Sequence, residues 1–181
     1  YYERRVFMNA IGPVWDGNAV WLVIVVGGLF AGFPGTYATI MSSFYIPITV
    51  FIAGLILRAV AIEFRGKNES RRWRRLWDSV FFSASLTIAF GAGILIGNMI
   101  QGIPLDSAED FTGDLGDMLT PYTILVGITA VACFIMHGIL YLVMKTEGAL
   151  HDKVRGWVNR CIIFFIVSYY ITTMATLIYQ P

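Results

Sequence analysis

The chain has 181 residues, of which 57% are hydrophobic and only 14% are charged, and its mean hydropathy is +0.68. This composition is typical of a protein dissolved in a lipid bilayer and excludes an ordinary water-soluble domain. The 13 basic residues nearly balance the 12 acidic ones, which argues against nucleic-acid binding, because that function needs a clustered basic excess.

Five apolar runs are long enough, or nearly so, to cross a hydrocarbon layer of about 30 Å as helices. They cover residues 15–33, 37–62, 80–103, 122–144 and 157–179. Only Pro34, Gly35 and Thr36 separate the first two runs, which predicts a tight hairpin and an antiparallel second helix. The sequence therefore predicts an all-α, polytopic, compact membrane bundle in which residues 1–181 form a single membrane domain.

The charges between the runs predict the orientation, because short loops rich in Lys and Arg stay in the cytoplasm. Two connections are basic, namely residues 63–78, with Arg65, Lys67, Arg71, Arg72, Arg74 and Arg75, and residues 145–155, with Lys145, Lys153 and Arg155. The connection between the third and fourth runs has five acidic residues and no basic one. With Arg4 and Arg5 also inside, the residue 1 end is expected in the cytoplasm and the residue 181 end outside a bacterial-type inner membrane.

Small and polar residues inside the runs have mainly structural interpretations. The pairs Gly28–Gly32 and Gly93–Gly97 are spaced to let helices approach closely. Asn98 and Gln101 are interpreted as residues of the outer headgroup boundary. Cys133 and Cys161 lie in apolar runs as small hydrophobes, so neither a disulfide nor a metal site is expected.

Asp16 is an acid at the start of the first run, where burial of a charge is costly. With Trp15 and Asn18 beside it, Asp16 is interpreted either as a helix cap at the water boundary or as the entrance of a proton path. Trp15 and Asn18 are candidate buried or subunit-facing partners of this acid.

Arg58 and Glu63 lie near the inner end of the second run. The simpler interpretation of Arg58 is that its side chain extends to the inner headgroups, and the alternative is that it faces a buried anion in a partner subunit. Their five-residue spacing turns the two side chains apart on a helix, so a salt bridge between them is not favoured. Either residue can therefore face another chain.

His137 lies deep in the fourth run. It can donate a hydrogen bond across helices, relay protons or ligate haem iron. The cross-helix hydrogen bond is favoured over the relay. Haem ligation has the weakest support, because no second histidine stands on a helix at ligand spacing.

Short sequence motifs along nearly the whole chain resemble subunit II of the cytochrome bd-type quinol oxidases, closest to the cyanide-insensitive branch. These motifs are Asn9-Ala-Ile-Gly-Pro13, Trp15-Asp-Gly-Asn18, Val20-Trp-Leu22, Gly27-Gly-Leu-Phe-Ala31, Phe33-Pro34, Tyr37-Ala38, Arg58-Ala-Val-Ala-Ile-Glu-Phe-Arg65, Arg72-Trp73, Trp77-Asp78, Gly97-Asn98, Gln101-Gly102, Pro121-Tyr122, His137-Gly138 and Lys145-Thr-Glu-Gly148.

The resemblance implies a haem-free subunit of a complex that oxidises quinol, reduces dioxygen to water and generates a proton-motive force. Haems b and d, or b only, would lie in the partner subunit I, so no cofactor or metal is expected to bind this chain directly. The expected partners are subunit I, quinol, the lipid bilayer and small accessory subunits. The family likeness makes Asp16 the first candidate for the proton path and Glu63 the second.

The chain also departs from the family pattern. Ala19 follows Asn18 where many relatives carry an acidic or amide side chain. The chain is expected to be a fragment that lacks the first helix and the C-terminal half of the family. A non-catalytic assembly scaffold and a secondary transporter are the alternative functions, and a transporter would be expected to show discontinuous helices and an internal repeat.

Overall fold

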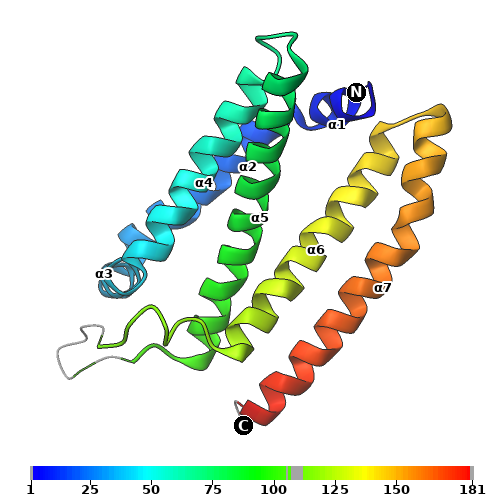
Figure 1. Cartoon of the computed structure of the whole chain (residues 1–181). Coiled ribbons are helices and arrows are strands. Elements are labelled where there is room, and N and C mark those ends of the chain that lie inside the picture. Colours follow the sequence, from blue (N-terminus) through cyan, green and yellow to red (C-terminus); the bar gives the residue numbers. More distant parts are fainter. Residues whose placement is uncertain (1, 105, 107–111, 180–181) are drawn as a thin grey trace.

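The computed structural model describes residues 2–104, 106 and 112–179, and the structure of this part is helical (Figure 1). The helices are α1 (Tyr2–Ile11), α2 (Trp15–Gly32), α3 (Pro34–Ser43), α4 (Tyr45–Phe64), α5 (Arg71–Gln101), α6 (Pro121–Lys145) and α7 (Gly148–Tyr179). Five of them, α2 and α4 to α7, are long and apolar enough to span a membrane, which confirms the predicted all-α membrane architecture.

The second predicted helix, over residues 37–62, is wrong as one continuous element. Pro34 occupies the first turn of α3, and the helix stops at Phe44, whose φ and ψ are −101° and 26°. Pro47 explains this break, because it has no N–H to donate to the carbonyl of Ser43. The predicted tight hairpin is therefore replaced by the short helix α3, which lies crosswise between α2 and the returning α4 (Figure 1).

Two helices begin earlier at the basic end than expected. α5 begins at Arg71 instead of residue 80, and α7 begins at Gly148 instead of residue 157. Arginine and other straight-chain residues are good helix formers, so the helices continue beyond the apolar stretch into the polar boundary.

α1 was not predicted as a helix, and it lies across the basic end in the space between α5 and α6 (Figure 1). Lys153 of α7 donates to both carboxylate oxygens of Glu3 at 2.8 Å. This hydrogen bond lowers the pKa of Glu3 below its ordinary value. The hydroxyl of Tyr141 on α6 donates to the carbonyl of Ala10 at 3.0 Å. These contacts with α6 and α7 help to hold α1 in place.

The four long helices α4 to α7 of the predicted bundle pack mainly against their neighbours in sequence. α5 and α6 approach closely where Gly93 meets Gly127. A Cβ atom placed on Gly93 would lie only 2.6 Å from the Cα of Gly127, so a larger residue does not fit there. The predicted role of the Gly93–Gly97 pair is confirmed. Gly28 and Gly32 face open space, so no helix of the described part of the chain packs closely on them, and their role in close packing stays a prediction.

Side chains at the acidic end hold the connection between α5 and α6. Asn98 is buried and donates to the carbonyl of Met118 at 2.9 Å, and the Thr123 hydroxyl donates to the same carbonyl at 2.8 Å. Gln101 accepts from the Thr120 hydroxyl at 2.9 Å. Asn98 is therefore a packing residue of this chain, and its place at the outer headgroup boundary stays a prediction.

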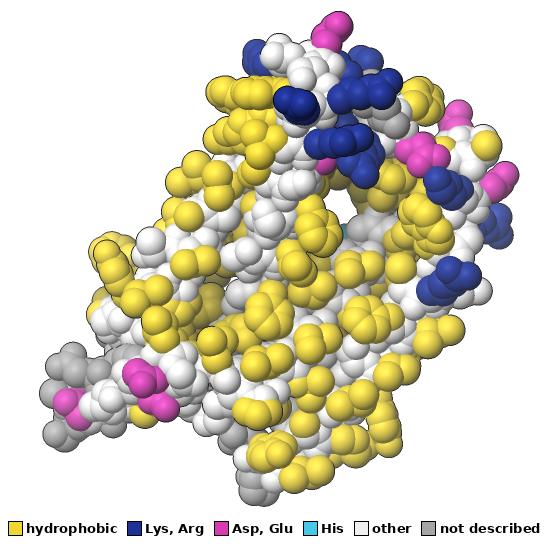
Figure 2. Space-filling model, in the orientation of Figure 1, with side chains coloured by type: hydrophobic (Ala, Val, Ile, Leu, Met, Phe, Trp, Pro, Cys, Tyr) yellow, Lys and Arg dark blue, Asp and Glu magenta, His cyan; other side chains and the backbone are white. Residues whose placement is uncertain are grey.

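The basic side chains in view lie toward one end of the helices, together with some acidic ones (Figure 2). Lys and Arg gather at the end that holds α1 and the α4–α5 connection, while the acidic connection before α6 lies at the opposite end. Between these ends the surface is largely apolar, and α2 has no buried residue. Lipid or other protein chains must cover these faces in a membrane.

Candidate functional site at the basic end

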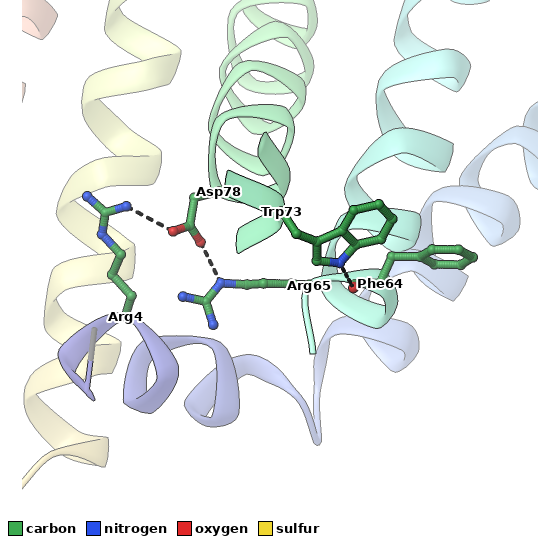
Figure 3. A network of polar contacts seen from close by, with 5 residues as sticks. All are labelled: Arg4, Phe64, Arg65, Trp73 and Asp78. Carbon is green, nitrogen blue, oxygen red and sulfur yellow. Dashed lines mark hydrogen bonds and ion pairs between the residues drawn. The ribbon is translucent and has the colours of Figure 1, made fainter. Parts of the chain in front are cut away.

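Asp78 of α5 joins three elements at the basic end (Figure 3). Its Oδ2 accepts a hydrogen bond from Nη1 of Arg4 on α1 at 2.9 Å. Its Oδ1 accepts one from Nε of Arg65, which follows α4, at 2.5 Å. We call these three residues the Asp78 cluster.

The Asp78 cluster is partly shielded from water. The Arg65 side chain is 7% exposed and that of Asp78 is 18% exposed, whereas Arg4 is 66% exposed. A buried arginine needs a carboxylate nearby, because an isolated charge in a low-dielectric setting is costly. Asp78 thereby holds the end of α4 against the beginning of α5 and fastens α1 to both.

Aromatic side chains also pack where α4 ends and α5 begins. At the end of α4 the carbonyl of Phe64 accepts from Nε1 of Trp73 at 2.8 Å and from the backbone N–H of Lys67 at 3.1 Å. The ring centroid of Trp77 lies 5.6 Å from those of both Phe64 and Trp73. Such rings are typical of the boundary between headgroups and hydrocarbon.

Asp16 lies in the first turn of α2 with its side chain exposed. The interpretation of Asp16 as the helix cap is wrong, because Val14 occupies the N-cap position and makes no side-chain cap bond. A carboxylate in the first turn still interacts favourably with the helix dipole. Trp15 is half-buried, and Asn18 is exposed.

Glu63 lies in the last turn of α4, and its side chain is exposed. A negative charge there is unfavourable for the helix dipole, so helix stability does not explain this residue. Asp16 and Glu63 both lie toward the end that carries the Asp78 cluster. Within the described ranges no ion pair or hydrogen bond is found between them.

Arg58 is half-buried on the face of α4 that packs on α5. It shares that face with the buried residues Gly54, Ala61 and Arg65, at helical spacing. Its guanidinium carbon lies 5.8 Å from the ring centroid of Phe81, a cation–π contact. The Arg58 side chain thus contacts its own chain, and its subunit-facing role stays a prediction.

His137 is exposed near the middle of α6, and the favoured hydrogen bond to another helix is not found among the described residues. His151 is different, because its Nδ1 lies 3.1 Å from the carbonyl of Val143 and 3.2 Å from that of Thr146. The described part of the chain contains no group of three His, Cys, Asp or Glu side chains that could hold a metal ion.

Sequence reasoning missed Arg4, Arg65 and Asp78 as members of one site. A signal existed, since Asp78 lies three residues after the arginine-rich segment that ends at Arg75 and comes just before an apolar stretch. An acid in that place is costly unless a cation pairs with it. The sequence could not show which of the many nearby arginines supplies the pair.

Comparison with known proteins identifies the family. Residues 1–180 match the family described as cytochrome bd terminal oxidase subunit II. The chain is 39% identical over 153 residues to cytochrome bd ubiquinol oxidase subunit 2 of Bacillus subtilis, covering 84% of this chain and 45% of that protein. It is 39% identical over 158 residues to cytochrome bd-I ubiquinol oxidase subunit 2 of Escherichia coli K12, covering 85% and 42%.

A third relative is a probable cytochrome oxidase subunit 2 of Haemophilus influenzae, which is 38% identical over 157 residues, or 84% of this chain and 42% of that protein. The chain thus spans less than half the length of the relatives it matches. The match over 180 of its residues is nevertheless specific, and the chain belongs to the cytochrome bd terminal oxidase subunit II family.

Proposed function

We propose that this chain acts in subunit II of a bd-type quinol oxidase, where it supports a haem-bearing subunit I and admits protons from the cytoplasm. The single observation that carries the proposal is the placement of Asp16 and Glu63. Both are exposed carboxylates toward the basic end of the helices, and Lys- and Arg-rich ends face the cytoplasm.

Reduction of dioxygen to water consumes protons along with the electrons that quinol supplies. Carboxyl groups suit proton uptake, because their ordinary pKa of about 4 rises when a partner surface buries them, so that they load and release protons near neutral pH. An exposed carboxylate on an apolar helix is placed for such burial in a complex.

The proposal assigns haem to the partner subunit. The donor set of the described residues supports this, since His151 is engaged with backbone carbonyls and His137 stands alone on an exposed face. Haem bound in the partner would supply the electron transfer and oxygen chemistry. The residues of this chain would pack against that partner and guide protons toward it.

Asp16→Asn tests the proton path. The amide keeps the size of the side chain and leaves the Val14 cap unchanged, but it cannot carry a proton as a carboxyl does. We expect the assembled complex to consume oxygen several-fold more slowly, with proton uptake slowed in parallel, in purified complex supplied with quinol.

Asp152→Asn is the matched control, because Asp152 is also an exposed acid of the basic end, on α7. It should leave turnover unchanged. Glu63→Gln tests the second candidate in the same assay. Unchanged turnover in assembled Asp16→Asn complex would remove Asp16 from the path and favour a purely structural subunit.

Arg58→Ala tests the subunit-facing role of Arg58. We expect the absorption spectrum of the partner's haems to shift or the yield of assembled complex to fall, and Arg58→Lys to restore part of either loss. Arg160→Ala removes an exposed arginine of α7 as the control. A normal spectrum with full activity in Arg58→Ala would show that the residue serves only its contact with Phe81.

A further inference from the structure

A cavity of about 430 Å³ lies between α1 and α5 at the basic end. Its volume falls within the range of about 300–1,000 Å³ that is usual for small-molecule sites. Its lining combines apolar side chains with one ion pair, and consists of Arg4, Phe7, Met8, Asp78, Ser79, Phe81 and Phe82.

Two further arginines lie on α5 before the cavity's lining residues, toward the polar start of that helix. Arg71 and Arg75 precede Asp78 and Phe82 on the same face of α5, at spacings of three, four and seven residues. Both side chains belong to exposed residues, and no ion pair to either is found within the described ranges. In the Asp78 cluster one carboxylate pairs with two arginines, so the cluster carries a net positive charge.

The cavity lies at the depth where headgroups meet hydrocarbon. Trp73 and Trp77 lie on the same part of α5, and the apolar span of α5 begins directly after Asp78. Positive side chains beside a membrane surface attract anionic lipid headgroups. A molecule that fits here has an apolar chain for Phe7, Met8 and Phe82 and a negative head for Arg71 and Arg75.

We propose that this cavity binds one anionic phospholipid, with an acyl chain between α1 and α5 and its phosphate at Arg71 and Arg75. A zwitterionic lipid would bring its own positive group among the arginines, and a neutral isoprenoid would leave them unmatched. Charge complementarity and the apolar wall therefore favour the anionic lipid.

Native mass spectrometry of the intact oxidase complex, purified in mild detergent from membranes that contain phosphatidylglycerol, tests the site. The double variant Arg71→Gln/Arg75→Gln should lose one bound anionic phospholipid that the unmodified complex keeps. The control Arg155→Gln/Arg160→Gln removes two exposed arginines from α7, away from the cavity, and should keep it.

Ser79→Phe tests the apolar half of the site with every charge retained. The added ring should fill the cavity and displace the same lipid, while the absorption spectrum shows that the complex still assembles. The proposal is overturned if Arg71→Gln/Arg75→Gln or Ser79→Phe complexes keep the lipid, if the molecule lost is neutral or zwitterionic, or if a protein subunit occupies this face.

Discussion

Gly93→Ala is expected to weaken the contact between α5 and α6. A Cβ at this position would lie 2.6 Å from the Cα of Gly127, 2.7 Å from the Cβ of Ala130 and 2.9 Å from the carbonyl oxygen of Val126. Two of these neighbours are backbone atoms and cannot move alone, so the helices must separate. Overpacking of this kind costs about 1–3 kcal/mol.

The measurement is the yield and the thermal unfolding of the purified complex. Gly28→Ala is the matched control, because it adds the same methyl group to a spanning helix where nothing lies within 4 Å. Equal stability of the Gly93→Ala and unmodified complexes would mean that the close crossing of α5 and α6 does not exist in the membrane.

Asp78→Asn is expected to loosen the basic end by removing the shared carboxylate of the Asp78 cluster. The amide oxygen can accept from only one of the two arginines, because the amide NH2 replaces the other carboxylate oxygen and is itself a donor. The amide also no longer balances the charge of a 7% exposed arginine side chain. Loss of a hydrogen bond between charged groups costs about 1.5–3 kcal/mol. We expect a lower unfolding temperature and faster proteolysis of the segment between α4 and α5.

Lys153→Gln removes the other ion pair that holds α1, and it is the control for Asp78→Asn. That pair is open to solvent, with side chains 47% and 49% exposed, so its loss should change stability little. If the two variants were equally stable, the Asp78 cluster would be no more than a surface contact.

The number of spans and the bounds of α2 and α6 could be predicted, because they follow from the length of the apolar runs and the charges between them. The break at Phe44 could not be read from hydropathy, which continues across it. Pro47 was the missed signal. The early starts of α5 and α7 were missed since charged residues were taken to mark loops, although arginine favours helix.

The sequence identified single candidate residues of the site, but it did not predict which side chains contact one another. Asp16 and Glu63 lie toward the expected end, since their places follow from their distance to the run ends. The pairing of Asp78 with Arg4 and Arg65 depends on how α1 crosses the ends of α4 and α5, which no periodicity encodes. The glycine pairs show the same limit of sequence-based prediction. Gly28 and Gly93 each begin a pair of glycines four residues apart, but Gly93 lies at a packed helix crossing and Gly28 lies on an open face.

The central proposal is that this protein supports a separate haem carrier in an oxidase. Its most direct test is isolation of the complex from native membranes through a tag on this protein, followed by an absorption spectrum of the eluate. The proposal predicts that a second subunit is retained together with reducible haem bands. A colourless eluate from membranes that consume oxygen with quinol would contradict it.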